Sequence, residues 1–144
     1  MCLLFIAHNV HPDYRLILAA NRDEYFDRPT ASAHFWETAP DLLAGKDLRA
    51  GGTWLGITRR GRIAALTNYR DPSRNRENAP SRGELVLECL SADASPHGIL
   101  ANLHARGQAY NGFNLHLAQG ATLLWYSNRN GPPQELAPGI YGVS

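Results

Sequence analysis

The sequence predicts a single α+β domain. Its 144 residues suit one domain with one hydrophobic core. Short apolar runs bounded by turn residues occur towards both ends of the chain, and two stretches with helical spacing lie between them. This order of strands, helix pair and strands favours a layered α+β fold over repeated βαβ units. We therefore expect residues 1–144 to form one domain.

The N-terminal region predicts a hairpin followed by irregular chain. Residues 3–8 and 15–20 are apolar runs, and the polar, proline-containing stretch 9–13 between them suits a turn. Residues 21–40 are rich in charge and proline, so we expect a functional loop or surface segment there, with one short strand at 34–37.

A second hairpin is expected after the glycine pair at 51–52, which suits a turn with positive φ. Its strands are 53–58 and 62–69, joined by a tight turn at 60–61. The charged stretch 71–80 contains two prolines and two asparagines and is expected to be a loop.

Two helices should follow this loop. Ser81 and Glu84 have the spacing of a capping box, and the apolar residues of 85–90 predict the first helix. Ser95 together with Ile99, Leu100 and Leu103 predicts the second, which should end near Gly107.

The C-terminal third again predicts strands. Residues 114–118 and 123–127 form a third hairpin around a turn at 119–120, and 139–144 read as the start of a further strand.

Composition excludes several classes of protein. Apolar residues make up 44% of the chain, charged residues 19%, and the formal charge is +1, which is typical of a soluble globular protein. Lys46 is the single lysine and the basic residues form no long run, so no nucleic-acid partner is expected.

Membrane and disulfide classes are not expected either. The longest apolar stretch, 2–7, is far shorter than the roughly 20 residues of a membrane span, and no basic segment precedes it as in a secretory signal. We expect a cytoplasmic protein. Cys2 and Cys89 are too few for a disulfide framework and form no CxxC motif.

Cys2 is the first candidate for chemistry, because of its position. Removal of Met1 would leave a thiol and a free α-amine on one residue. An α-amine titrates near about 7.7–8.0 and a thiol near about 8.5, so the amine can take the proton of the thiol at neutral pH. The alternative is that Cys2 is a small apolar residue at the start of a buried strand.

Several motifs in a fixed order carry a family resemblance. They are Ala20-Asn21-Arg22-Asp23-Glu24, Arg28-Pro29, Ala50-Gly51-Gly52-Thr53-Trp54-Leu55-Gly56, Leu66-Thr67-Asn68-Tyr69-Arg70, Ser81-Arg82-Gly83-Glu84-Leu85 and Tyr110-Asn111-Gly112-Phe113-Asn114-Leu115. With them the chain resembles the NRDE family, also called the transport and Golgi organisation family, over nearly its whole length.

The resemblance implies a fold. Members of this family begin with Met-Cys and are similar to the cysteine-type N-terminal nucleophile hydrolases, the group of penicillin V acylase and bile salt hydrolase. That group has a four-layer αββα sandwich, of which this shorter chain would hold the N-terminal half. The chain is then either a truncated member or a reduced domain that completes its sheets as a homo-oligomer.

The same resemblance implies catalytic residues. Asn21 and Asp23 match the Asn-x-Asp element of those hydrolases, in which Asp23 would accept a hydrogen bond from the amine of Cys2. Arg22 lies one position from an arginine of that group and would favour the thiolate. Its alternative role is a salt bridge to Glu24 or Asp27.

Three further asparagines complete the candidate site. Asn68 resembles the asparagine that binds the oxyanion, and its alternative role is that of a turn residue. Asn111 and Asn114 flank the entry of a strand and would either reach a substrate pocket or satisfy backbone groups.

No metal site is expected. His8 and His11 lie around a strand end and a turn, and His97 and His104 lack an acidic partner at zincin spacing. The leading hypothesis is a cofactor-free cysteine amidohydrolase that cleaves a small-molecule amide other than a peptide. The alternative is a non-catalytic protein that binds or carries haem or another apolar ligand, with Cys2 or a histidine as the haem ligand.

Overall fold

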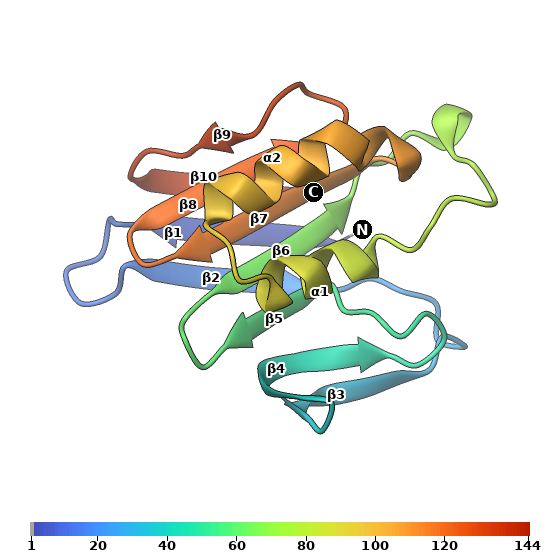
Figure 1. The fold of residues 1–144 in the computed structure, drawn as a ribbon, viewed down its shortest axis with the longest axis horizontal. Helices are drawn as coiled ribbons and strands as arrows, with labels where there is room; N and C mark the ends of the chain where they lie inside the picture. Colours follow the sequence, from blue (N-terminus) through green and yellow to red (C-terminus); the bar gives the residue numbers. More distant parts are fainter. Residues whose placement is uncertain (1) are drawn as a thin grey trace.

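Two antiparallel β-sheets and one layer of helices make up the computed structural model, which describes residues 2–144 (Figure 1). The strands are β1 (Leu3–His8), β2 (Leu16–Asn21), β3 (Thr30–Trp36), β4 (Ala39–Asp47), β5 (Leu55–Thr58), β6 (Ile63–Asn68), β7 (Phe113–Gln119), β8 (Thr122–Ser127), β9 (Gln134–Glu135) and β10 (Gly139–Val143). The helices are α1 (Gly83–Ser91) and α2 (Pro96–Arg106), with the short 3-10 helices η1 (Pro72–Arg74) and η2 (Gly107–Ala109).

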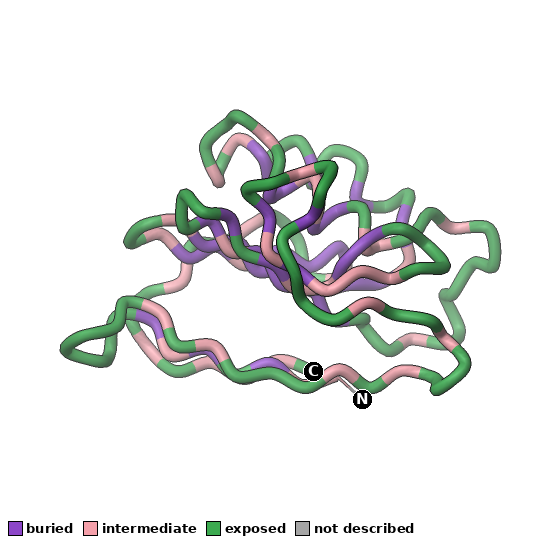
Figure 2. Tube along the Cα trace, turned by 90° about the horizontal axis from the view of Figure 1, so that it is seen from below, coloured by how far each residue is buried: buried purple, intermediate pink, exposed green. Residues whose placement is uncertain are grey.

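The smaller sheet has the strand order β10-β1-β2 and brings the two ends of the chain together (Figure 2). Its inner face buries Leu4 and Ile6 against residues of the larger sheet. On its outer face Phe5, Ile17 and Ile140 are exposed. The first hairpin and the last strand are thus confirmed, whereas the homo-oligomer stays a prediction.

The larger sheet has the order β3-β4-β5-β6-β7-β8-β9 and lies between the helices and the smaller sheet (Figures 1 and 2). Alternate residues of β7 explain this position. Phe113, Leu115 and Leu117 pack on the helix side, while Ala118 packs towards the smaller sheet. The fold is mixed α+β, as predicted, and its three layers are compatible with the αββα arrangement that the resemblance implies.

The irregular segment expected at 21–40 is the main error in the predicted fold. Strands β3 and β4 form a long hairpin there, and the short strand expected at 34–37 overlaps the end of β3. β3 is an edge strand with mostly exposed residues, so it lacks the apolar alternation that would have revealed it. Trp36 fixes its end, because Trp36 Nε1 donates a 3.0 Å hydrogen bond to the Ala44 carbonyl.

The capping box expected at the start of the first helix is also wrong. Arg82 is the residue that precedes α1, and its side chain makes no capping hydrogen bond. Ser81 Oγ accepts only a 3.4 Å bond from the Gly83 amide, and Glu84 turns towards Tyr110. The second helix is confirmed as α2, and Ser95 caps it by accepting a 3.2 Å bond from the Gly98 amide.

Within residues 2–144, none of the helices is both long enough and apolar enough to cross a bilayer.

Candidate functional site

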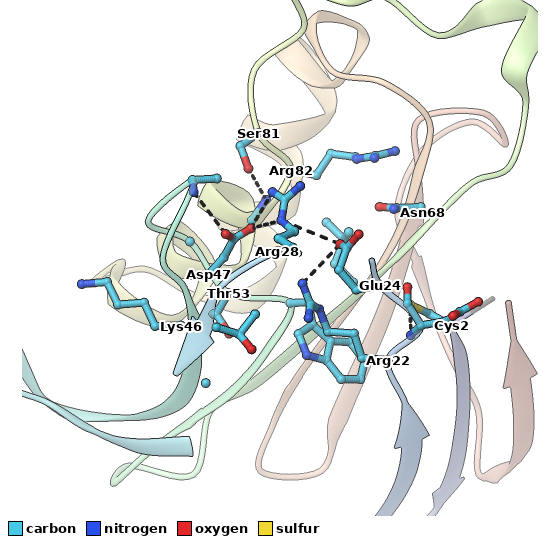
Figure 3. Close-up of a pocket in the computed structure, with 18 of the residues that line it drawn as sticks. Cys2, Arg22, Glu24, Arg28, Lys46, Asp47, Thr53, Asn68, Ser81 and Arg82 are labelled. Carbon is cyan, nitrogen blue, oxygen red and sulfur yellow. Dashed lines mark hydrogen bonds and ion pairs between the residues drawn. The ribbon is translucent and has the colours of Figure 1, made fainter. Parts of the chain in front are cut away.

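An open cavity of about 420 Å³ lies where the start of β1, the segment after β2 and the N-terminus of α1 meet (Figure 3). Parts of β4, the turn at 50–54 and the end of β6 complete its wall. Seven of its lining residues are charged: Arg22, Asp23, Glu24, Arg28, Lys46, Asp47 and Arg82. A cavity of this size and lining suits a small polar molecule.

Cys2 lies on this cavity next to the segment that follows β2. The register of the first hairpin pairs Leu3 with Asn21, which brings Asp23 beside Cys2. Cys2 Sγ accepts a 3.4 Å hydrogen bond from the Asp23 amide and lies 3.8 Å from the Asp23 carbonyl oxygen. The side chain of Cys2 is partly buried. The predicted removal of Met1 concerns a residue outside those described.

Arg22 lines the cavity but has an acidic partner. Arg22 Nη2 lies 3.2 Å from Glu24 Oε2, which is one of the two salt bridges expected as its alternative role. Glu24 Oε2 also lies 3.8 Å from Arg28 Nε. The segment 22–28 is therefore held by ion pairs along one wall of the cavity.

Arg28 joins this wall to the end of β4. Arg28 Nη2 lies 2.6 Å from Asp47 Oδ2, and Asp47 Oδ1 accepts hydrogen bonds from the amides of Arg49 and Ala50 at 3.0 and 3.1 Å. Partial burial of Asp47 opposes ionisation, but these donors outweigh it and lower the pKa of its carboxyl. The ionised Asp47 carboxylate therefore holds the turn that leads into the glycine pair at 51–52. Gly51 has a φ of +76°, which confirms the positive φ predicted for this turn.

Asn68 ends β6 on the same cavity. The strand register pairs it with Phe113, and the next amide, that of Tyr69, donates a 2.9 Å bond to the Gly112 carbonyl. The side-chain amide of Asn68 makes no hydrogen bond to residues 2–144, so its N–H groups are available to a ligand.

Of the other three predicted asparagines, one borders the cavity and two do not. Asn111 borders the cavity, but its amide binds both backbone groups of Arg76, at 2.8 and 3.0 Å, and so anchors the 71–80 loop. Asn21 ends β2 and is not among the lining residues. Asn114 is buried, lies 3.4 Å from Thr67 Oγ1 and is likewise absent from the lining. The structure thus brings together Cys2, Arg22, Asp23, Asn68 and Asn111.

Sequence reasoning missed Arg82 as a site residue. Arg82 Nη1 donates a 2.8 Å bond to the Gly112 carbonyl from the start of α1. Burial, and to a smaller extent the charge of Arg28, lowers the pKa of Arg82, although the charge of Glu24 acts in the opposite direction. The Ser81-Arg82-Gly83 motif contains this residue, but only the helix packing shows that it borders the cavity.

Two residues outside the cavity have strongly altered titration. Cys89 is fully buried on α1, and burial raises the pKa of its thiol to about 12. His116 is buried on β7, and burial lowers its pKa to about 4.

Among residues 2–144 no group of three or more histidine, cysteine or carboxylate side chains is placed to hold a metal ion.

The family model and the relatives that match this chain all belong to one family. A family model described as "Transport and Golgi organisation 2" matches residues 1–144. The chain is 46% identical to the Transport and Golgi organization protein 2 homolog of Bos taurus, over 100% of this chain and 56% of the relative. Identity to the mouse homolog is 43% with the same coverage, and to the Drosophila melanogaster protein it is 38% over 69% of this chain and 38% of the relative. The chain spans about half the length of its mammalian relatives.

Proposed function

The chain belongs to the transport and Golgi organisation 2 family, and we propose that it is a cysteine amidohydrolase that cleaves a non-peptide amide. The observation that carries the proposal is the cavity shared by Cys2, Asp23 and Asn68. These residues come from three separate segments, and together they supply a nucleophile, a carboxylate and an amide donor.

The first half of the proposed reaction forms a thioester. Removal of Met1 frees the α-amine of Cys2, and this amine takes the proton of the thiol. The thiolate attacks the carbonyl carbon of the amide, and the resulting oxyanion accepts a hydrogen bond from Asn68. The tetrahedral intermediate then collapses: its carbon–nitrogen bond breaks, and the α-ammonium gives its proton to the departing amine.

The second half regenerates the enzyme. Water loses a proton to the α-amine and attacks the thioester, and the carbon–sulfur bond breaks to give a carboxylic acid and the free thiol of Cys2. Asp23 orients the amine in both halves. A single oxyanion donor such as Asn68 is worth about 2.7–4 kcal/mol of transition-state stabilisation.

The names of the relatives refer to transport and Golgi organisation. The alternative hypothesis is a protein that carries haem or another apolar ligand. The charged lining of the cavity favours a polar amide over a porphyrin. Titration with haem separates the two hypotheses. The carrier hypothesis requires a shifted Soret band that is lost in Cys2→Ala or in a histidine variant, and we expect no such Cys2-dependent band.

The direct test uses untagged protein and a panel of fluorogenic N-acyl aminomethylcoumarins. Intact mass first reports whether Met1 is removed. Acid quenching during turnover should then trap one acyl group on Cys2, and Cys2→Ala should lose both the adduct and the release of coumarin. Cys89→Ala is the matched control and should retain both.

Asn68→Ala should lower kcat by about 100- to 1000-fold, while the exposed Asn78→Ala should leave it unchanged. Retention of Met1, coumarin release by Cys2→Ala, or the absence of any acyl adduct across the panel would refute the proposed function.

A further inference from the structure

We propose that the amide substrate carries a carboxylate close to its scissile bond, and that Arg82 is the residue that binds it. This inference rests on the proposed function, since it names the substrate class of the same cavity. Most of the charged residues that line the cavity pair with one another.

The cationic side chains of the cavity differ in their partners. Arg22 pairs with Glu24, and Arg28 pairs with both Glu24 and Asp47. The ammonium of Lys46 lies 4.7 Å from the centre of the Trp36 ring, and Figure 3 shows its side chain directed away from Cys2. Each of these three cations therefore has an interaction within the protein.

Arg82 is the exception. Within residues 2–144 no carboxylate lies within 4.0 Å of its guanidinium, and its one hydrogen bond joins Nη1 to the Gly112 carbonyl. Nε and Nη2 remain as donors. The residue is partly buried, and Glu24, whose charge acts on it from beyond 4.0 Å, is already paired with Arg22 and Arg28. A partly desolvated cation in this position gains from a ligand that brings a negative charge into direct contact.

The position of Arg82 relative to the reacting groups supports a role in binding substrate. The Gly112 carbonyl accepts hydrogen bonds from both Arg82 Nη1 and the amide of Tyr69, the residue that follows Asn68. This shared acceptor keeps the guanidinium near the end of β6. Figure 3 shows the Arg82 side chain reaching in the direction of Asn68, which also borders the cavity.

A carboxylate is the anion that best matches these donors. It is planar and singly charged, and a guanidinium presents two parallel N–H groups that bind both of its oxygens. The lining has four cationic and three anionic side chains, so one added negative charge balances it. A phosphate monoester carries closer to two charges at neutral pH and fits this balance less well.

The first test compares matched substrates on the unaltered protein. Glutaryl and pentanoyl aminomethylcoumarin have acyl chains of equal length, and only the first ends in a carboxylate. N-pentanoylglycine and N-pentanoylglycinamide make the same comparison on the leaving-group side. We expect kcat/KM to be higher for the carboxylate member of at least one pair by about tenfold or more, mainly through KM. Equal values in both pairs would overturn the inference.

Two variants test whether Arg82 is responsible for the preference for the carboxylate substrate. Arg82→Met removes the charge at similar length, and Arg82→Lys keeps the charge but removes the paired N–H groups. Both should abolish most of the preference for the carboxylate substrate while hydrolysis of its neutral partner continues. Arg59→Met is the matched control, because Arg59 is exposed and lies over Phe35 outside the cavity lining. A preference that survives in both Arg82 variants would assign the carboxylate to another residue.

A binding measurement separates failure of this inference from failure of the proposed function. Free glutarate should slow the alkylation of Cys2 by iodoacetamide in the unaltered protein, and this protection should be lost in Arg82→Met. Protection without hydrolysis would refute the amidohydrolase but keep the carboxylate site, whereas hydrolysis without protection or substrate preference would refute the carboxylate site alone. Inorganic phosphate at equal concentration should protect Cys2 less, and equal or better protection would refute the preference for a carboxylate.

Discussion

Tyr110 Oη donates a 2.6 Å hydrogen bond to Glu84 Oε1, which ties the segment before β7 to the first turn of α1. Tyr110 is 5% exposed, so its phenol has little access to water. Tyr110→Phe leaves the carboxylate of Glu84 without this donor and should lower the free energy of unfolding by about 2 kcal/mol, measured by denaturant titration. Tyr25→Phe, at a side chain that is 81% exposed, should change it by less than about 0.5 kcal/mol. Equal effects of the two variants would show that the bond contributes nothing.

Gly52 and Gly83 touch through their backbones at the wall of the cavity. A Cβ on Gly52 would lie 2.7 Å from the carbonyl carbon of Gly83, closer than van der Waals contact allows. Gly52→Ala should therefore push α1 outward and lower the free energy of unfolding by about 1–3 kcal/mol. Gly51→Asn is the control, because Gly51 has positive φ and open space around it, and asparagine tolerates that conformation. A melting temperature that falls no further for Gly52→Ala than for Gly51→Asn would argue against the close contact.

His116 should make folding sensitive to acid. Burial lowers its pKa to about 4, and neither ring nitrogen has a hydrogen-bond partner among residues 2–144. The unfolded chain, with a histidine pKa near about 6.5, binds a proton first as the pH falls, so stability decreases on acidification. Between pH 6.5 and 5 this loss should be about 2 kcal/mol and should disappear in His116→Leu.

The control for this titration is His97→Leu, which alters an exposed histidine beside Glu135. It should leave the pH dependence of the unfolding free energy close to that of the unaltered protein. The prediction fails if His116→Leu and the unaltered protein lose stability in parallel over this range.

The two cysteines should differ in reactivity. Cys89 is fully buried and its pKa is about 12, so only about one thiol in ten thousand is ionised at pH 8. Cys2 is partly exposed on the cavity. Iodoacetamide should add one carbamidomethyl group to the native protein, at Cys2, and a second only after denaturation. In mass spectra, native Cys2→Ala should stay unmodified, and rapid labelling of that variant would contradict the burial of Cys89.

Most hairpins could be predicted because their signals are local. Gly61 and Gly120 have φ of +76° and +62°, and each sits in the turn where the sequence places a tight connection. The hairpin of β3 and β4 escaped prediction because β3 is exposed at a sheet edge. An exposed strand has no buried face, so it needs no alternation of apolar residues.

The candidate site was predicted from one position and from family motifs. Cys2 was named from its place at the start of the chain, Asp23 and Asn68 from those motifs, and all three border the cavity. Glu84 shows the limit of local reasoning: it has the spacing of a capping box, but its carboxylate binds Tyr110, which is distant in sequence. A better long-range partner overrides a local capping preference.

The helices, the tight turns and the strands other than β3, β4 and β9 follow from the sequence, since they depend on apolar periodicity and on backbone conformations within a few residues. That Cys2, Asn68 and Arg82 border one cavity is visible in the folded chain alone. Strand register and helix packing bring these distant segments together, and the Gly112 carbonyl, thirty residues further along the chain, holds Arg82 there.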